Sequence, residues 1–296
     1  MPSSKRLRVL VALDGSPASD ATVETVLGFP WPDSTRVGGV VAVDTTPFRL
    51  QSRPLHDALR SALEHEVGSA RDALASRWRD AEVVVMDGKP VETVLAQARR
   101  AHADVIALGW RGHGSFRRLL AGSVSRGVAA RAESSVLVVR TAPQRVKRFV
   151  VGFDGGPNSR RAVKLLGRLA PGRDHQAVLV RIIEPADPFP GRAARLPAAV
   201  RATIRNRIAE LEAERRAEAA AALETAAAQL EAMGWNTATE LLNGSSLAAL
   251  LTASRVHRAD VLVVGARETT GVRRALLGSV AEGVLNHSRT PVLIVR

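Results

Sequence analysis

The hydrophobic pattern of the chain alternates between short apolar runs and longer amphipathic segments. Short runs bounded by glycine, proline or aspartate are typical of buried parallel strands. In the first half of the chain they occupy residues 8–13, 37–43, 82–86, 105–108 and 135–139. The segments between them carry apolar residues at helical spacing, most clearly over residues 56–78. Strands that alternate with helices predict an α/β fold with a parallel, doubly wound sheet.

The same pattern then occurs a second time. Asp154 follows an apolar run as Asp14 does, at an offset of 140 residues (154 − 14), and Gly278 repeats Gly122 at an offset of 156 (278 − 122). The second copy therefore contains 16 additional residues (156 − 140) between its second and third strands. They fall in the Ala/Glu/Arg-rich stretch 202–233, whose high helix propensity predicts a longer helix than its counterpart.

The repeat predicts two tandem domains, residues 1–141 and 147–296, joined by a linker that contains Pro143. Each is expected to be a flavodoxin-like or Rossmann-like unit with a five-stranded parallel sheet. The last apolar strand of each copy would be an exposed edge unless it were paired. We therefore expect the two halves to pack as an intramolecular pseudo-dimer. The sequence leaves open whether two chains also form a homodimer.

Composition limits the chemistry that is available. Apolar residues make up 46% of the chain, enough for two cores, whereas the 3% of aromatic residues predicts cores of Ala, Val and Leu. The absence of cysteine excludes disulfides and thiolate metal sites, and the histidines lack metal-ligand spacing. No apolar run reaches the length of a transmembrane helix, and the N-terminal run is too short for a signal peptide. We expect a cytoplasmic protein without a membrane partner.

The formal net charge of +13 allows two interpretations. One is a nucleic acid or another acidic surface as partner. The other is an arginine-rich composition spread over solvated helix faces. No window of the sequence combines a basic cluster with stacking aromatic residues, which favours the second interpretation.

A glycine-rich stretch follows the apolar run at residues 105–108. Gly109 and Gly112 are separated by two residues, and Gly122-Ser123 follows nine residues later at the start of a predicted helix. Glycine lets a backbone approach a ligand closely. A helix N-terminus offers unpaired N–H donors and the positive end of the helix dipole. This order of strand, loop and helix predicts a loop that holds the phosphates of a nucleotide.

The arrangement resembles the universal stress protein family over nearly the whole chain. Gly109, Gly112, Gly122 and Ser123 match the loop pattern of its nucleotide-binding branch, which is Gly, two residues, Gly, nine residues, Gly and Ser or Thr. The first-strand aspartate and the final apolar strand occur in both copies. The resemblance implies that ATP is the ligand and that Mg²⁺ accompanies it. The loop itself does not distinguish ATP from AMP or cyclic AMP.

The resemblance also implies roles for individual residues. Asp14 would lie near the ribose or a bound Mg²⁺, unless it serves only to form the turn. The backbone of Ala42 would face the adenine, although the family usually has Val there. The helix start would offer N–H groups and hydroxyls to phosphate. The implied set in the first copy is Asp14, Ala42, Gly109, Arg111, Gly112, Gly122, Ser123, Val124 and Ser125, with Arg117 and Arg118 either near phosphate or simply exposed to solvent.

The second copy departs from the family pattern at one position. Glu268 stands where the second loop glycine is expected, and its Cβ and carboxylate would hinder a polyphosphate. The second site would then be empty or weak, or Glu268 would turn outward and binding would survive. The residues that would carry binding are Asp154, Ile182, Gly265, Gly278, Ser279 and Val280.

The function implied is that of an ATP-binding stress-response sensor or regulator whose conformation depends on the nucleotide and is recognised by a protein partner. One alternative is a slow ATPase or phosphotransferase, which lacks an obvious general base in the sequence. The other is a basic nucleic-acid-binding module. No catalytic or metal-ligating residue is assigned.

Overall fold

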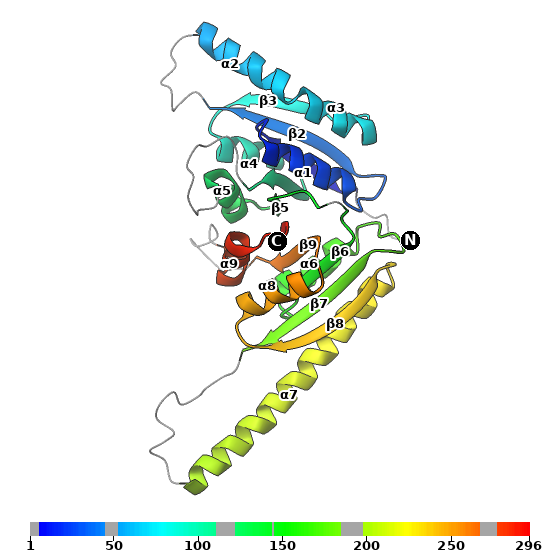
Figure 1. The fold of residues 1–296 in the computed structure, drawn as a ribbon, viewed down its shortest axis with the longest axis vertical. Coiled ribbons are helices and arrows are strands. Elements are labelled where there is room, and N and C mark those ends of the chain that lie inside the picture. Colours follow the sequence, from blue (N-terminus) through cyan, green and yellow to red (C-terminus); the bar gives the residue numbers. More distant parts are fainter. Residues whose placement is uncertain (1–5, 45–52, 111–121, 144, 185–197, 267–276) are drawn as a thin grey trace.

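The computed structural model describes residues 6–44, 53–110, 122–143, 145–184, 198–266 and 277–296 (Figure 1). In the first half of the chain the elements are β1 (Arg8–Leu13), α1 (Pro17–Gly28), β2 (Arg36–Val43), α2 (Arg53–Glu66), α3 (Gly68–Arg77), β3 (Val83–Asp87), α4 (Pro90–Arg100), β4 (Val105–Gly109), α5 (Ser123–Arg131) and β5 (Ser135–Val139). The segment 56–78, predicted as one helix, forms two, because the chain breaks helical geometry at Val67 beside the weak helix former Gly68.

The second half repeats this order with one helix where the first half has two. Its elements are β6 (Arg148–Gly152), α6 (Pro157–Leu166), β7 (Gln176–Ile183), α7 (Ala198–Glu231), β8 (Asn236–Asn243), α8 (Ser246–Val256), β9 (Val261–Gly265), α9 (Ser279–His287) and β10 (Val292–Val295). The helix α7 is 34 residues long and includes most of the stretch 202–233, where the longer helix was predicted.

The ten described strands form one sheet, in the order β3-β2-β1-β4-β5-β10-β9-β6-β7-β8. Neighbouring strands within each half are parallel, as the sequence predicts. The halves join where β5 and β10 pair antiparallel, with Leu293 opposite Leu137. Each final strand therefore covers the edge of the other, so the pseudo-dimer is a single continuous sheet.

Helices cover both faces of this sheet (Figure 1). On one face, α1, α3, α6 and α7 pack over a core that runs through both halves. On the other face, α4, α5, α8 and α9 enclose a second continuous core. Successive residues of a strand point to opposite faces, so Val9 and Val11 enter the first core and Leu10 enters the second. Among the described residues, no helix is both long and apolar enough to cross a membrane.

Aromatic side chains link the two halves in the first core. Phe29 stacks on Trp31 with ring centroids 4.4 Å apart and meets Phe149 of the second half edge-on at 5.5 Å. Phe149 in turn meets Trp235 edge-on at 5.0 Å. The prediction of cores without aromatic packing is wrong at this junction. Four of the chain's few aromatic residues meet where the halves join, which an average composition cannot reveal.

A pair of arginines also ties each half to the other. Arg140 donates hydrogen bonds to the carbonyl oxygens of residues 285–286, at 2.9 and 2.8 Å, in the last turn of α9. Arg296 donates hydrogen bonds to the carbonyl oxygens of residues 129–130, at 2.6 and 2.9 Å, in the last turn of α5. Each cation thereby caps the negative end of a helix dipole in the opposite half. Burial lowers the pKa of Arg296.

The helices α5 and α9 also interact near their N-terminal ends. Arg126 of α5 lies 3.0 Å from Glu282 of α9, and both side chains are partly exposed. An ion pair thus joins the two helices near their beginnings. At its C-terminal end, each helix is bonded to the arginine that follows the final strand of the other half.

We predict that Phe149→Ala lowers the free energy of unfolding by about 3–5 kcal/mol, because it removes a fully buried ring from the junction of the halves. Urea unfolding monitored by circular dichroism measures the change. Val256→Ala is the control, since Val256 is 68% exposed and its truncation should change stability by less than about 0.5 kcal/mol. Equal effects of the two substitutions would show that the aromatic contacts contribute little.

Candidate functional site

The residues singled out in the sequence lie at the carboxyl ends of strands. In the first half β1 lies between β2 and β4, so the chain crosses in opposite directions on its two sides. In the second half β6 lies in the same way between β7 and β9. Such a switch point leaves a crevice at the carboxyl ends of the strands, which is where open α/β sheets bind ligands.

An aspartate-glycine turn follows the central strand of each half. Asp14 accepts hydrogen bonds from the Ser16 hydroxyl at 2.6 Å and the Ser16 N–H at 3.1 Å. Asp154 accepts from the Gly156 N–H at 2.8 Å and the Ser159 hydroxyl at 2.7 Å. In each carboxylate these bonds fall on the Oδ1 atom. Both aspartates therefore form the turn through Oδ1, and Oδ2 takes no part in these turn bonds.

The base of the first glycine loop is closed by backbone contacts. Trp110, which follows β4, accepts a hydrogen bond from the Gly122 N–H at 3.1 Å. A Cβ atom on Gly122 would collide with the Trp110 carbonyl oxygen. The glycine is thus needed for the loop to close onto the start of α5. Arg111, Gly112, Arg117 and Arg118 lie outside the described residues, and so does Glu268 of the second half.

The hydroxyl of Ser125 also bonds to the backbone at the base of this loop. It donates to the Trp110 carbonyl at 2.9 Å, and the side chain is 1% exposed. The expectation that Ser125 offers a second hydroxyl to phosphate therefore does not match the structure. The sequence places Ser125 two residues after Ser123, but the helix turns it towards the loop backbone, where it satisfies a buried carbonyl.

The starts of α5 and α9 are suited to an anion. Gly122 and Gly278 are the residues at the N-caps, and as glycines they bring no capping side chain to the first N–H groups. Ser123 and Ser279 are exposed at the first helical position, and Val124 and Val280 follow them partly exposed. The first N–H groups and the positive end of the helix dipole therefore lie at both of these helix starts.

Two further glycines allow strand and helix to approach closely. A Cβ atom on Gly109 at the end of β4 would lie 2.9 Å from the carbonyl oxygen of Ala18 in α1. A Cβ atom on Gly265 at the end of β9 would lie 3.0 Å from the carbonyl carbon of Asn158 in α6. Both glycines thus bring the start of a helix against the floor of the crevice, independently of any ligand.

A cavity of about 570 Å³ occupies the crevice of the second half. It is lined by the residues that the sequence named there, which are Asp154, Ile182, Gly265, Gly278, Ser279 and Val280. Its volume lies in the range that is usual for small-molecule sites. In the first half, Ala42 lies near the end of β2, partly exposed, at the position that matches Ile182.

Sequence reasoning missed other residues that line this cavity. Leu250 of α8 and Val264 of β9 add apolar wall, and Asn158 and Ser246 add polar groups. The Asn158 side chain donates to the carbonyl of Ala266 and is therefore fixed in place. No motif marks these residues, although their positions just after a strand or at the start of a helix could have suggested them.

The start of α8 is held by Glu184, which follows β7. Its carboxylate accepts hydrogen bonds from the Ser246 hydroxyl at 2.7 Å and the Ser246 N–H at 3.1 Å. These bonds hold the pKa of Glu184 below its usual value. The carboxylate is therefore ionised at neutral pH, and it fixes Ser246 at the cavity wall.

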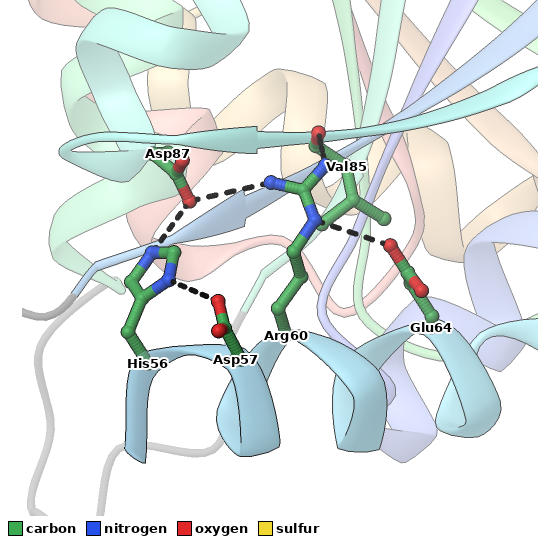
Figure 2. A network of polar contacts seen from close by, with 6 residues as sticks. All are labelled: His56, Asp57, Arg60, Glu64, Val85 and Asp87. Atoms are coloured by element: carbon green, nitrogen blue, oxygen red, sulfur yellow. Dashed lines mark hydrogen bonds and ion pairs between the residues drawn. The ribbon is translucent and has the colours of Figure 1, made fainter. Parts of the chain in front are cut away.

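A polar network at the edge of the first half was also not predicted (Figure 2). His56 lies 2.9 Å from the carboxylate of Asp87 at the end of β3, and Arg60 lies 3.5 Å from it. Arg60 also donates to the carbonyl of Val85 at 2.8 Å and contacts Glu64 at 3.2 Å. The network fastens α2 to the edge strand and presents no nucleophile, so we regard it as structural.

Several basic side chains line a second cavity, of about 640 Å³, which lies between the halves. Arg99, Arg161, Lys164 and Arg168 are among its lining residues. Arg168 is paired with Asp104 at 2.9 Å. Across the residues that the structure describes, no group of three or more His, Asp or Glu side chains is arranged to hold a metal ion.

Comparison with known proteins places the chain in a family. The sequence model of the Universal stress protein family matches residues 5–140 and again residues 145–296. The chain belongs to the universal stress protein family. Its tandem form accounts for the repeated site.

Two relatives in sequence each match about half of this universal stress protein. Universal stress protein MJ0531 of Methanocaldococcus jannaschii is 30% identical over 159 residues, which are 54% of this chain and 87% of the relative. A universal stress protein encoded next to a sulfhydrylase gene of Thermus aquaticus is 30% identical over 133 residues, 45% of this chain and 97% of the relative.

Two solved structures match the tandem arrangement as a whole. A universal stress protein from Archaeoglobus fulgidus DSM 4304 has a TM-score of 0.72 at 20% identity and covers 99% of this chain and 98% of its own. A putative universal stress protein from Pseudomonas aeruginosa UCBPP-PA14 has a TM-score of 0.59 at 16% identity, with 98% and 93% covered. At these identities the likeness concerns the fold.

We predict that Gly109→Ala lowers the free energy of unfolding by about 1–3 kcal/mol, because the added methyl group would press on the backbone of α1. Thermal and urea unfolding measure the effect. Gly68→Ala is the matched control, since a Cβ atom there meets nothing within 4 Å and lies in a helix. The control should be neutral or stabilising by up to about 1 kcal/mol. A Gly109→Ala protein as stable as the control would contradict the close approach.

Proposed function

We propose that this universal stress protein binds ATP with Mg²⁺ in the strand-end crevices of its two halves and acts as a nucleotide-dependent sensor or regulator in the stress response. The observation that carries the proposal is the cavity of about 570 Å³, in which the six residues named from the second copy lie together. The proposal extends to the first half because the sequence there has the complete glycine loop.

The lining of the cavity suits each part of a nucleotide. Ile182, Leu250 and Val264 supply an apolar wall for a base. Asp154 has one carboxylate oxygen committed to its turn and a second one that suits a ribose hydroxyl or a hydrated Mg²⁺. The N–H groups at the start of α9 would receive the phosphates. Mg²⁺ would neutralise phosphate charge, and the protein groups would orient the nucleotide.

The two sites are expected to differ in affinity. The first half offers Gly109, Gly122 and Ser123 together with the complete loop pattern. The second half has Glu268 in place of a loop glycine, and a carboxylate close to phosphate is repulsive. We therefore propose tighter binding in the first half and weaker binding in the second.

The regulatory part of the proposal rests on the contact between α5 and α9. Both helices would receive phosphate at their N-termini, and Arg126 and Glu282 pair in their first turns, 3.0 Å apart. An anion bound at one helix start acts on the neighbouring charges, since the pair is only partly exposed. Occupancy of one site can therefore bias the other helix and the surface around it, which a partner protein would recognise.

We predict that Ser123→Asp abolishes the tighter ATP-binding event and that Ser279→Asp abolishes the weaker one. An aspartate in the first turn of a helix favours the helix, whereas its charge repels phosphate from the same N–H groups. Titration calorimetry with ATP and Mg²⁺ measures both events. Loss of binding without loss of stability is the expected result.

Arg289→Asp serves as the control, since Arg289 is exposed in the turn beyond the opposite end of α9 and the substitution also lowers the net charge. It should leave both events unchanged. If the wild-type protein binds no ATP, the proposal fails. If Ser123→Asp and Ser279→Asp bind as the wild type does, the nucleotide lies elsewhere.

A further inference from the structure

The helix α7 consists of two parts with different surroundings. Its C-terminal part packs on the second half through Ala219, Leu223 and Leu230, which are at most 2% exposed. Before Ala219, no residue of α7 whose side chain the structure describes is buried. Figure 1 shows α7 running beside β8 and continuing well beyond the sheet. The projecting part runs from Val200 to Arg215 and spans about 23 Å. The next residue, Arg216, donates a hydrogen bond to the side chain of Asn243 at the end of β8, at 2.6 Å.

The projecting part has an apolar stripe. Val200, Ile204, Ile208 and Leu211 recur at intervals of four, four and three residues, which places them along one side of the helix. Val200 and Leu211 are 44% and 39% exposed. In the described part of the chain, four large apolar side chains are exposed, and these are two of them. An isolated helix of this length is marginally stable in water. A stripe of this kind therefore calls for a partner surface.

This stripe is not directed at the second half of the chain. At 100° per residue, it lies about 80° around the helix from the line of Ala219, Leu223 and Leu230 that packs on the sheet. A second helix can therefore lie along the stripe without displacing the contacts of α7 with β8.

Charges beside the stripe indicate what that second helix is. Arg205 and Glu212 lie on one flank of the stripe, and Arg207 and Glu214 lie on the other. On each flank the arginine precedes the glutamate by seven residues, which is two helical turns. A helix with the same sequence, turned end for end, would therefore place glutamate opposite arginine on both flanks.

We propose that α7 is a homodimerisation element that pairs antiparallel with α7 of a second copy of this chain. In this alignment Ile208 packs against Leu211 of the other chain, and Leu211 against its Ile208. Arg205 faces Glu212 of the second copy, and Arg207 faces Glu214. The twofold symmetry forms each contact twice. The aliphatic stem of Arg215 would cover Ile204 of the other chain at each end.

Other alignments of the same two helices are less favourable. Moving the antiparallel pair by one heptad, so that Ile204 meets Ile208, brings Arg205 against Arg205 and Arg207 against Arg207. A parallel pair in register would stack Arg215 on Arg215 in the seam. Both arrangements place like charges together.

Arg207 is already beside Glu210 of its own helix, at 2.9 Å, and this neighbour raises its pKa. Both side chains of that pair are more than 60% exposed. An exposed pair of this kind contributes little to stability. Arg207 is thus free to contact Glu214 of the second copy at little cost.

Sedimentation equilibrium of the full chain tests the proposal. The wild type should form dimers reversibly, and Ile208→Glu should raise the dimer dissociation constant at least about tenfold. Ala213→Glu is the matched control, because residue 213 is exposed on the opposite side of the same projecting part. It should dimerise as the wild type does.

A charge exchange tests the pairing itself. Arg205→Glu and Glu212→Arg should each weaken the dimer, and the double variant should restore it. Because the chain has no cysteine, a spin label can be attached at Ala217→Cys alone. The two labels should then lie about 22 Å apart along the helix axis, whereas a parallel pair would bring them side by side.

Three results would overturn the proposal. They are a wild type that stays monomeric at all concentrations, a dimer that Ile208→Glu does not weaken, and a double variant weaker than both single ones. Nucleotide binding does not enter any of these measurements, so the outcome is independent of the proposed function.

Discussion

The antiparallel contact between β5 and β10 is the constraint on which the rest of the structure depends. It covers the β5 edge of the first half and the β10 edge of the second, so that β3 and β8 are the outer strands of the described sheet. It also makes both hydrophobic cores continuous across the chain. It also brings α5 and α9 together, so that Arg140 and Arg296 can each cap a helix in the other half. Without this pairing, Phe149 would lose its partner Phe29.

Close backbone approaches shape the candidate site as much as side chains do. The crevice exists because Gly109, Gly122 and Gly265 let helix starts and loop backbone lie where a Cβ atom would collide. These three glycines, which the resemblance singled out for a ligand, therefore also have a packing role that is independent of any ligand. The structure thus gives a physical reason for the residue type that the resemblance did not.

Most of the fold could be predicted from the sequence, because strand and helix periodicity, the repeat and the need to cover a final strand are local or symmetry-based signals. The break at Val67 was missed, although the adjacent weak helix former Gly68 is a local signal for it. The bond from Ser125 to Trp110 could not be predicted, since the two residues are 15 positions apart in the chain. The junction of aromatic rings was missed because Phe29 and Phe149 are distant in the chain. Of the residues that line the cavity of the second half, Asp154, Gly265 and Gly278 were named from the sequence because they belong to the repeated pattern, whereas Asn158 and Leu250, which have no motif, were not.

The pair Arg126–Glu282 shows how the two halves of the chain have become different from each other. The two residues occupy equivalent positions of the repeat, 156 residues apart (282 − 126), and they meet across the axis that relates the halves. In an assembly of two identical halves this place would hold Arg against Arg or Glu against Glu. Opposite charges at this place require two halves of different sequence, as the tandem chain has. At this contact each half therefore favours its unlike counterpart over a copy of itself.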